Sequence, residues 1–295
     1  MFSYRHAFHA GNHADVLKHL TLVSVLQHLT QKEVPLLAVD THAGAGGYDL
    51  HQRQAQTSAE ASGGVQRLMD GLPELGEPSP ALADYLAVLQ AANPGGGLRH
   101  YPGSPWLMQH LLRENDRVRL FEMHPTEWRV LSQNVKGWQA GRRVTVHHAD
   151  GFEGLTPLMP PPSRRGLVLI DPSYELKTDY GRVIDTVQTC LKKFATGVYV
   201  IWYPIIARPQ AQQLPKQLTK AAQAAQKPWL HATLRVQSGA SGGSANPRSL
   251  GPLSASGMVV INPPHTLNER LKAALPQVVQ ALGQDHFAGF TLQQG

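Results

Sequence analysis

Short apolar runs alternate with segments of helical periodicity along most of the 295-residue chain. Seven apolar runs have the length and composition of buried strands, at residues 35–40, 118–122, 144–148, 166–171, 198–203, 232–236 and 258–262. Helical spacing of apolar residues occurs at 13–31, 105–113, 125–135, 179–193 and 209–225. Because strands that alternate with helices form parallel sheets covered on both faces, the pattern predicts an α/β fold with a mostly parallel, doubly wound sheet of seven strands.

Residues 48–99 break this alternation, since no strand pattern follows the glycine-rich turn after the first strand for roughly seventy residues. The stretch contains two helical patterns, at 57–69 and 81–91, joined by a Pro- and Gly-rich segment. We therefore expect 48–99 to form an inserted helical subdomain. The remaining residues are expected to form one Rossmann-like domain that comprises 1–47 and 100–295, with an N-terminal arm and helix over 1–19.

Composition and charge indicate the cellular compartment of the protein and the class of its partner. The single cysteine, Cys190, excludes an intramolecular disulfide and a multi-cysteine metal site, which favours a reducing compartment. No apolar run is long enough to span a bilayer, so we expect a cytoplasmic protein without a membrane partner. A formal net charge of +6 and a pI near 9.5 favour a nucleic-acid partner without requiring one.

The apolar run 166–171 leads directly into Asp171, Pro172, Ser173 and Tyr174. Proline cannot continue the hydrogen-bond ladder, so Asp171 is expected at the carboxyl end of a buried strand, where open α/β sheets bind ligands. The Asp171 carboxylate and the Pro172 carbonyl can accept hydrogen bonds from an exocyclic amino group, while the Tyr174 ring stacks on the base that carries it. This segment resembles the Asp-Pro-Pro-Tyr motif of amino-group N-methyltransferases, with Ser173 at the position of the second proline.

Four acids, Asp40, Glu122, Asp150 and Asp171, each follow a predicted strand and are expected at one edge of the sheet. Any one of them could instead be a helix N-cap, but the joint pattern favours a ligand site. Glu122 there can bind a ribose diol, and Asp150 an adenine amino group.

The first strand leads through Asp40 into a turn in which Gly44 lets the backbone approach a ligand closely. The turn lacks the third glycine of a Gly-x-Gly-x-x-Gly motif, and no strand-ending acid follows about twenty residues later, which argues against NAD. A glycine-rich turn, a strand-ending acid and a later Asp-Pro-x-Tyr, in this order, fit S-adenosylmethionine instead.

The N-terminal segment is dense in histidine and aromatic residues. We interpret it as a recognition arm, in which Tyr4, Arg5 and Phe8 offer stacking and phosphate contacts to RNA; packing of the arm on its own domain is the alternative. His9 and His13 are four residues apart, but no partnering acid or cysteine cluster accompanies them, so we expect no metal.

A second segment, Asn262-Pro263-Pro264-His265, matches the Asp-Pro-Pro-Tyr class at both prolines. It lacks a good stacking ring, lies near the C-terminus and follows a Gly- and Ser-rich stretch, 238–256, which is expected to form a mobile connection between the last two strands. We therefore expect a turn rather than a catalytic site.

Several motifs together make the chain similar, over nearly its whole length, to the RlmJ family of bacterial 23S rRNA adenine-N6 methyltransferases. They are residues 4–19, 40–44, 101–105, 149–152, 164–167 and 177–180. The resemblance implies a class I methyltransferase fold, transfer of a methyl group from S-adenosylmethionine to N6 of adenine 2030 in 23S rRNA, and a contact of Tyr4 with the RNA. It also implies contacts to the cofactor or the reacting centre by His19, His42, Ser104, Glu122, Asp150, Gly151 and Asp171.

Two other functions remain open on the sequence. A DNA adenine-N6 methyltransferase would share the chemistry but would usually carry a larger target-recognition region than 48–99. A non-catalytic RNA-binding module is disfavoured by the retention of Asp171 and Tyr174. The expected partner is 23S rRNA, either protein-free or at an early stage of assembly.

Overall fold

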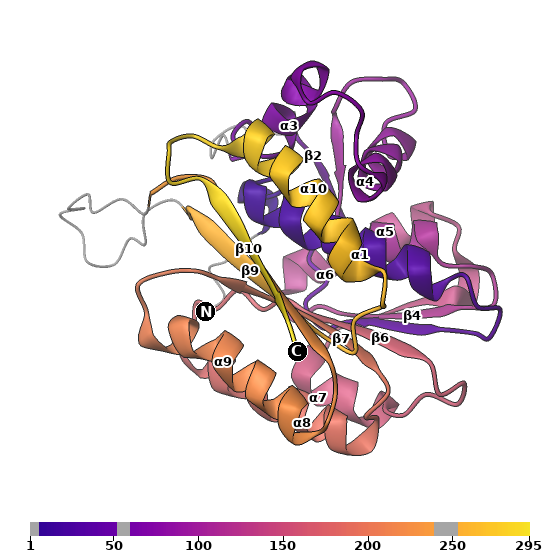
Figure 1. Cartoon of the computed structure of the whole chain (residues 1–295). Coiled ribbons are helices and arrows are strands. Elements are labelled where there is room, and N and C mark those ends of the chain that lie inside the picture. The colour runs from indigo at the N-terminus through magenta and orange to yellow at the C-terminus, as the bar shows by residue number, and fades with distance from the viewer. Residues whose placement is uncertain (1–5, 52–59, 239–252) are drawn as a thin grey trace.

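The computed structural model contains one twisted sheet of eight strands with helices on both faces (Figure 1). It describes residues 6–51, 60–238 and 253–295. The strands are β1 (Leu37–Asp40), β4 (Arg117–Phe121), β5 (Val144–His147), β6 (Gly166–Ile170), β7 (Val198–Pro204), β8 (Trp229–Arg235), β9 (Ala255–Ile261) and β10 (Gly289–Gln294). Their order across the sheet is β10-β8-β9-β7-β6-β1-β4-β5.

Adjacent strands from β5 to β7 are parallel, whereas β9 runs antiparallel to both β7 and β8, and β10 runs antiparallel to β8. The predicted α/β fold with a mostly parallel sheet is therefore confirmed, and each of the seven predicted strands is present. The eighth strand, β10, was not predicted. It is an edge strand that, in the described part of the chain, pairs only with β8, and four of its six residues are Gly, Thr or Gln, which leaves a weak apolar pattern.

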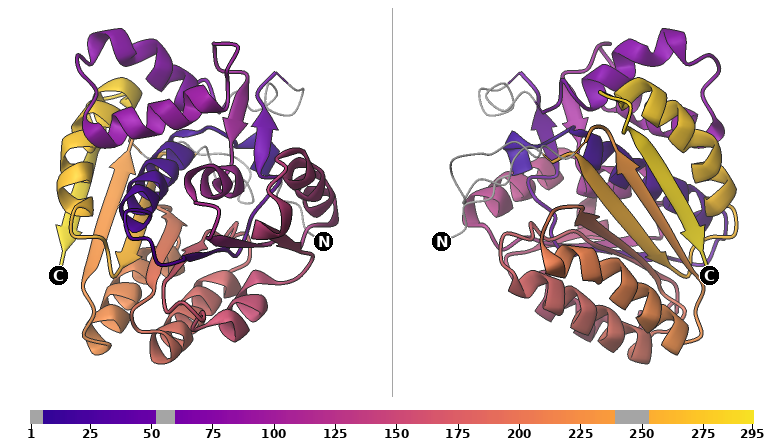
Figure 2. Two further views of the ribbon diagram at one scale, coloured as in Figure 1. Left: turned by 90° about the vertical axis from the view of Figure 1, so that its right-hand side faces the viewer. Right: turned by 60° about the vertical axis from the view of Figure 1, so that its left-hand side comes forward.

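Nine α-helices are found in the described residues. They are α1 (His13–Leu29), α3 (Val65–Gly71), α4 (Pro80–Ala91), α5 (Ser104–Leu111), α6 (Pro125–Gly137), α7 (Gly151–Leu155), α8 (Thr178–Lys193), α9 (Pro209–Ala224) and α10 (Leu267–Leu282). One layer contains α1, α5 and α10, and the opposite face of the sheet carries α7, α8 and α9 (Figure 2). No helix of the described ranges is long and apolar enough to cross a membrane.

The predicted insertion begins and ends at a small two-stranded sheet of β2 (Gly47–Asp49) and β3 (His100–Pro102), neither of which was predicted. Between them, α4 packs on both α1 and α10, and α3 packs on α10. Buried side chains of α3 and α4 share one apolar cluster with those of α1. The insertion thus contributes to the core of the molecule, and its status as a separate subdomain over 48–99 stays a prediction.

Helix α1 crosses the interior of the protein, and every residue from His13 to Leu26 is buried. It contacts β7, β8 and β9 on one side and α4, α5 and α10 on others, so it has no solvent-facing stripe along this length. Polar side chains in its first two turns are therefore inside the protein and need partners there. The partners of Lys18 and Asp15 include Asp171 and His6, which lie at the candidate site.

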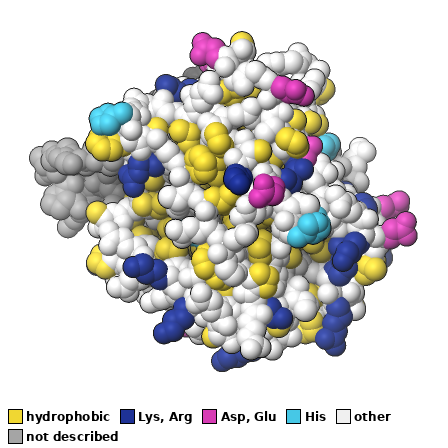
Figure 3. Space-filling model, viewed as in Figure 1, with side chains coloured by type: hydrophobic (Ala, Val, Ile, Leu, Met, Phe, Trp, Pro, Cys, Tyr) yellow, Lys and Arg dark blue, Asp and Glu magenta, His cyan; other side chains and the backbone are white. Residues whose placement is uncertain are grey.

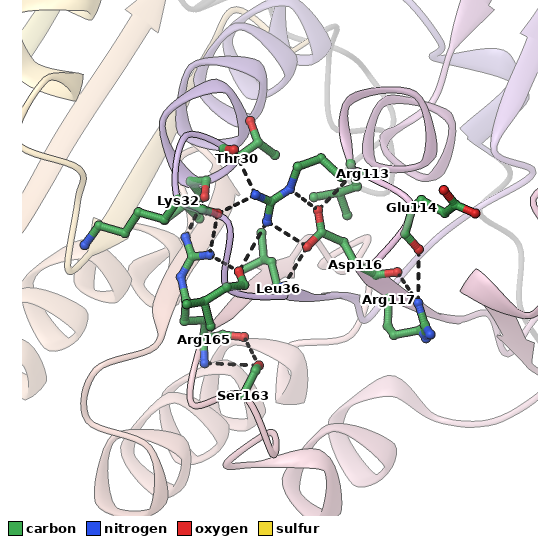
Figure 4. A network of polar contacts seen from close by, with 12 residues as sticks. Thr30, Lys32, Leu36, Arg113, Glu114, Asp116, Arg117, Ser163 and Arg165 are labelled. Carbon is green, nitrogen blue, oxygen red and sulfur yellow. Dashed lines mark hydrogen bonds and ion pairs between the residues drawn. The ribbon is translucent and has the colours of Figure 1, made fainter.

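The other end of α1 is held by two arginines at the opposite edge of the sheet (Figure 4). Arg165 donates to the carbonyls of Leu29 (2.5 Å), Lys32 (3.2 Å) and Val34. Arg113 donates to the carbonyls of Thr30 (3.1 Å), Lys32 and Val34 (3.2 Å) and forms an ion pair with Asp116. The last carbonyls of a helix have no partner within it, so Arg165 at Leu29 and Arg113 at Thr30 supply missing donors, and both guanidinium groups also hold the segment that follows the helix.

Candidate functional site

A cavity of about 380 Å³ opens at the carboxyl ends of β1, β4, β5 and β6. The structure brings most of the predicted site residues to its wall. These are His19, His42, Gly44, Ser104, Glu122, Asp150, Gly151, Asp171 and Pro172. Tyr174 does not line the cavity, and Tyr4 and Arg5 lie outside the described residues. The shared location agrees with a single ligand site, and the role of each residue stays a prediction.

Two glycines shape the floor of the cavity. Gly44 has φ +58°, and a Cβ atom there would lie 2.4 Å from the Tyr48 hydroxyl oxygen. A Cβ atom at Gly151 would lie 2.0 Å from the carbonyl oxygen of Thr41. Only glycine fits at either position, which allows the loops after β1 and β5 to approach each other and expose backbone to a ligand.

Glu122, directly after β4, is held by two backbone donors. Its carboxylate accepts hydrogen bonds from the N–H groups of Gly44 (2.8 Å) and His124 (2.6 Å). Burial raises the pKa of Glu122 to about 7, although these two hydrogen bonds oppose the shift. The carboxyl group therefore titrates near neutral pH at a fixed position in the cavity wall.

Asp40, at the end of β1, lies behind the wall and does not line the cavity. It is fully buried and accepts hydrogen bonds from the Ser104 hydroxyl (2.6 Å) and the His42 N–H (3.1 Å). Burial raises the pKa of Asp40 to about 6. Asp40 thus orients the Ser104 hydroxyl and the glycine-rich turn.

Asp150 fulfils the helix-capping role that was the alternative to ligand binding, and it also lines the cavity. Its Oδ1 accepts from the Phe152 N–H (2.9 Å) at the start of α7, and its Oδ2 accepts from Arg182 (2.7 Å). Burial disfavours the charged form, but the Arg182 hydrogen bond and charge outweigh it and lower the pKa of Asp150. The Arg182 guanidinium lies 4.5 Å from the Phe152 ring centroid, which builds one wall from a cation and an aromatic ring.

A buried ion pair joins α1 to the Asp171 segment. Lys18 Nζ lies 2.5 Å from Asp171 Oδ2 and 2.8 Å from Asp15 Oδ1, and the Lys18 side chain is 6 % exposed. Beyond it, His6 Nε2 lies 2.9 Å from Asp15 Oδ2. Burial alone would lower the pKa of Lys18, but the two carboxylates more than offset this and raise it. Lys18 therefore stays charged between them.

The second oxygen of Asp171 is open to the cavity. Burial raises the pKa of Asp171, and the charge of Lys18 opposes this shift. Lys18 bonds Oδ2, and among the described residues no hydrogen bond reaches Oδ1. The side chain of Asp171 is 13 % exposed at the cavity that it lines. A donor in the cavity can therefore reach a carboxylate whose other oxygen is already held.

Sequence reasoning did not single out Lys18. A usable signal was present, because a lysine in a run of apolar residues that covers all faces of a helix must be buried, and a buried ammonium group needs a carboxylate. The identity of that carboxylate depends on tertiary packing, because Asp15 and Asp171 both contact Lys18.

Tyr174 lies beneath the loop that follows β6 and not at the wall of the cavity. It has φ +54°, which turns its ring into the core, where it is 2 % exposed. Its hydroxyl donates to the Trp202 carbonyl (2.7 Å), and its ring centroid lies 4.6 Å from that of Tyr180. The structure therefore does not place Tyr174 where it could stack on a base, and that predicted role requires the loop to rearrange. Ser173, by contrast, lines the cavity.

Two histidines of the cavity wall, His19 and His42, are held in the neutral form. Burial lowers the pKa of His19 to about 3 and that of His42 to about 4. His19 Nδ1 lies 2.8 Å from the Tyr101 hydroxyl oxygen, and the two rings stack. Neutral rings of this kind provide hydrogen-bonding and packing surfaces without adding charge beside Lys18.

His9 and His13 have separate partners. His9 lies 2.8 Å from a Glu60 oxygen, and His13 lies 2.7 Å from the Leu253 carbonyl. No group of three or more His, Cys, Asp or Glu side chains that could hold a metal ion is found in the described residues.

Asn262 lies far from the cavity along the strand direction. It has φ +54°, and its amide donates to the carbonyls of Ala195 (2.9 Å) and Gly197 (2.7 Å), just before β7 begins. Because β9 runs antiparallel to β7, this is the edge of the sheet opposite Asp171. The position agrees with the predicted turn, although β10 makes β9 the last strand but one.

Comparison with known proteins identifies the family. The model of the family "Ribosomal RNA large subunit methyltransferase D, RlmJ" matches residues 33–293. The chain is 40 % identical to Ribosomal RNA large subunit methyltransferase J of Escherichia coli, with 94 % of this chain and 92 % of that protein covered. The protein of the same name from Haemophilus influenzae is 39 % identical, with 99 % and 98 % covered. A crystal structure of a Legionella pneumophila protein is 31 % identical, with a TM-score of 0.83 over 97 % of this chain and 98 % of that one. The chain therefore belongs to the RlmJ family of ribosomal RNA large subunit methyltransferases.

Proposed function

We propose that this protein transfers a methyl group from S-adenosylmethionine to N6 of an adenine in large-subunit rRNA, at the position of adenine 2030 in 23S rRNA. The observation that carries the proposal is Asp171. One of its oxygens is held by Lys18, and the other is open to a cavity at the carboxyl edge of the sheet. Family membership supports the methyl transfer and the ribosomal RNA substrate.

The residues around the cavity fit the cofactor by their chemistry. Glu122 offers carboxylate oxygens to a ribose diol, and the wall formed by Phe152 suits an adenine ring. The backbone near Gly44 and Gly151 allows close approach, and Ser104 presents a hydroxyl. S-adenosylmethionine, when bound, supplies an electrophilic methyl group on a sulfonium centre.

Asp171 has the central role in the mechanism. The adenine amino nitrogen is a poor nucleophile because its lone pair is delocalised into the ring, so catalysis depends on positioning and electrostatics. Asp171 Oδ1 and the Pro172 carbonyl accept hydrogen bonds from the amino group and favour its pyramidal form. Lys18 holds Oδ2 and prevents the carboxylate from turning away. Asp171 or solvent takes the proton.

A base must leave its stack to reach this cavity, and that costs least in a loop or single strand. This supports RNA over a DNA duplex, and 23S rRNA that is protein-free or at an early stage of assembly over the finished subunit. Such a substrate supports a cytoplasmic location.

Methylation of protein-free 23S rRNA by the purified protein with labelled S-adenosylmethionine tests the proposal. We expect the label at N6 of one adenosine, and little label on assembled large subunits. Label in DNA but not in RNA would overturn the proposed substrate, and cofactor binding without transfer to either would favour a non-catalytic RNA-binding module.

Two substitutions test the assignment of the site. Asp171→Ala removes the acceptor for the amino group and should reduce methyl transfer at least about 10²-fold, the scale typical of a positioned catalytic group. Asn262→Ala alters the Asn-Pro-Pro-His segment at the opposite edge of the sheet and should leave the single-turnover rate within about threefold of wild type. The reverse result would contradict the assignment of Asp171.

A further inference from the structure

A second hollow opens beside the cavity, between the first turns of α8 and the first half of α9. Its volume is about 520 Å³. Lys177 and Arg182 line one side, and Gln210, Gln213 and Gln217 line the other. Arg182 also lines the first cavity, so the two hollows share a wall.

The side chains of this groove suit a polar, anionic ligand. The three glutamines lie four or fewer residues apart on α9, and each is exposed. A primary amide both donates and accepts, so a row of glutamines can bind phosphates, sugars and base edges. Lys177 and Arg182 add positive charge; Asp185 is the acidic residue among the described residues that line the groove, and Arg182 is also paired with Asp150.

The net positive charge of the chain lies in the segment that contains α8 and α9, and it is spread along both helices, from the groove to their last turns. Residues 177–227, which contain α8 and α9, carry eight Lys or Arg and two Asp residues, a formal charge of +6. This equals the formal net charge of the entire chain, so the remaining residues are balanced. On the face in Figure 3, Lys and Arg side chains without acidic ones occupy the lower part, where α8 and α9 lie in Figure 1. Such a field attracts a polyanion.

The groove lies next to the segment that contains Asp171. The Asp171 segment leads through residues 172–176 directly to Lys177, the residue that precedes α8. Arg182 contacts Asp150 on its cavity side while it lines the groove. A chain that delivers a base to Asp171 can therefore continue over Arg182 into the groove without crossing another element.

We propose that the groove between α8 and α9 binds RNA nucleotides that flank the methylated adenosine. The inference rests on the proposed function and adds to it the surface that holds the substrate strand. Gln210, Gln213 and Gln217 bind sugars or base edges, and Lys177 binds a phosphate. Arg182 separates the target base from its neighbours.

The test adds negative charge inside the groove without changing side-chain size. Gln213→Glu combined with Gln217→Glu should raise the KM for protein-free 23S rRNA about tenfold, because each carboxylate repels phosphate. The kcat at saturating RNA and the Kd for S-adenosylmethionine should not change. The control is Gln212→Glu with Gln223→Glu, which adds the same charge to exposed positions of α9 outside the groove and should leave KM within about twofold.

A single substitution tests the groove independently, in case the double variant does not fold. Lys177→Gln should reduce by about one the slope of log affinity for RNA against log salt concentration, as expected for one lost phosphate contact. Three results would each contradict RNA binding by the groove: an unchanged KM in the double variant, an equal rise of KM in the control variant, or an unchanged salt slope in Lys177→Gln. Methylation of RNA by the wild-type protein is measured before any variant is compared. If the wild-type protein methylates no RNA, that result contradicts the proposed function and not the groove.

Discussion

Lys18 illustrates how strongly single residues at this site depend on their neighbours. It is buried between Asp15 and Asp171, and the protein stabilises its charge where an isolated ammonium group would be neutral. Burial also shifts Asp40 and Glu122 toward the protonated form. Perturbed groups that gather around one cavity are typical of functional sites, since the same burial that shifts a pKa strengthens electrostatic interactions with a ligand.

The raised pKa of Glu122 leads to a prediction about pH. With a pKa of about 7, the carboxyl group is mainly protonated at pH 6 and mainly ionised at pH 8, and the ionised form has the full acceptor capacity of both oxygens, whereas the protonated form carries a donor on one of them. If Glu122 binds a ribose diol, affinity for S-adenosylmethionine should rise up to about tenfold across this range. Calorimetric titration at several pH values measures this affinity.

Glu122→Gln provides the comparison. The amide cannot ionise, so the variant should bind more weakly at pH 8 and lose the pH dependence assigned to Glu122. The ratio of the two affinities cancels the titration of the cofactor itself. A ratio that does not change with pH would exclude Glu122 as the titrating contact.

Ser173 offers a test of the turn after β6. It stands where the related motif has a second proline, and its hydroxyl oxygen is 3.5 Å from the Glu175 N–H. Proline would restrict the backbone without altering Asp171 or the Pro172 carbonyl. Ser173→Pro should therefore leave the single-turnover rate similar or higher. A loss of more than about tenfold, or 1.4 kcal/mol in the barrier, would show that this turn depends on serine.

Helix α1 connects the two edges of the sheet. Its first turns provide Lys18 and His19 to the cavity, and its last carbonyls accept from Arg113 and Arg165. Its position is thus set from both ends as well as by burial along its length. Removal of a clamp should therefore affect the stability of the whole molecule.

Arg165→Leu tests this clamp. It removes hydrogen bonds to the carbonyls of Leu29, Lys32 and Val34, and we expect a loss of about 2 kcal/mol, since hydrogen bonds to charged groups contribute most when partly buried. A change of this size should lower Tm by roughly 3 °C for a protein of this length, because the entropy of unfolding grows with the number of residues. Arg142→Leu, at an exposed position, is the matched control. Equal Tm values for the two variants would contradict the clamp.

At the scale of the whole molecule, the order of elements could be predicted and their packing could not. The seven strands and the edge at which Asp40, Glu122, Asp150 and Asp171 meet follow from periodicity and the geometry of parallel sheets. Helix α10 was missed although Leu267, Leu271 and Leu275 follow helical spacing, and Pro276 lies inside it as Pro215 lies inside the predicted helix α9.

The parts of the site that escaped prediction depend on tertiary contacts. Local sequence shows an acid, a proline and a tyrosine, but the left-handed backbone of Tyr174 decides that its ring enters the core. Similarly, Lys18 and Asp171 are 153 residues apart, and only the passage of α1 through the interior brings them together.

The central position of α1 has a consequence for related sequences. The family model matches residues 33–293, a range that begins after this helix. A chain that started at residue 33 would still be recognised as a family member, yet it would have no counterpart of Lys18 or His19 and would leave the apolar faces of α4, α5 and α10 uncovered. A truncated chain can therefore match the family model and still lack residues that methyl transfer needs. The presence of the first helix should be checked before such an activity is assigned to a related sequence.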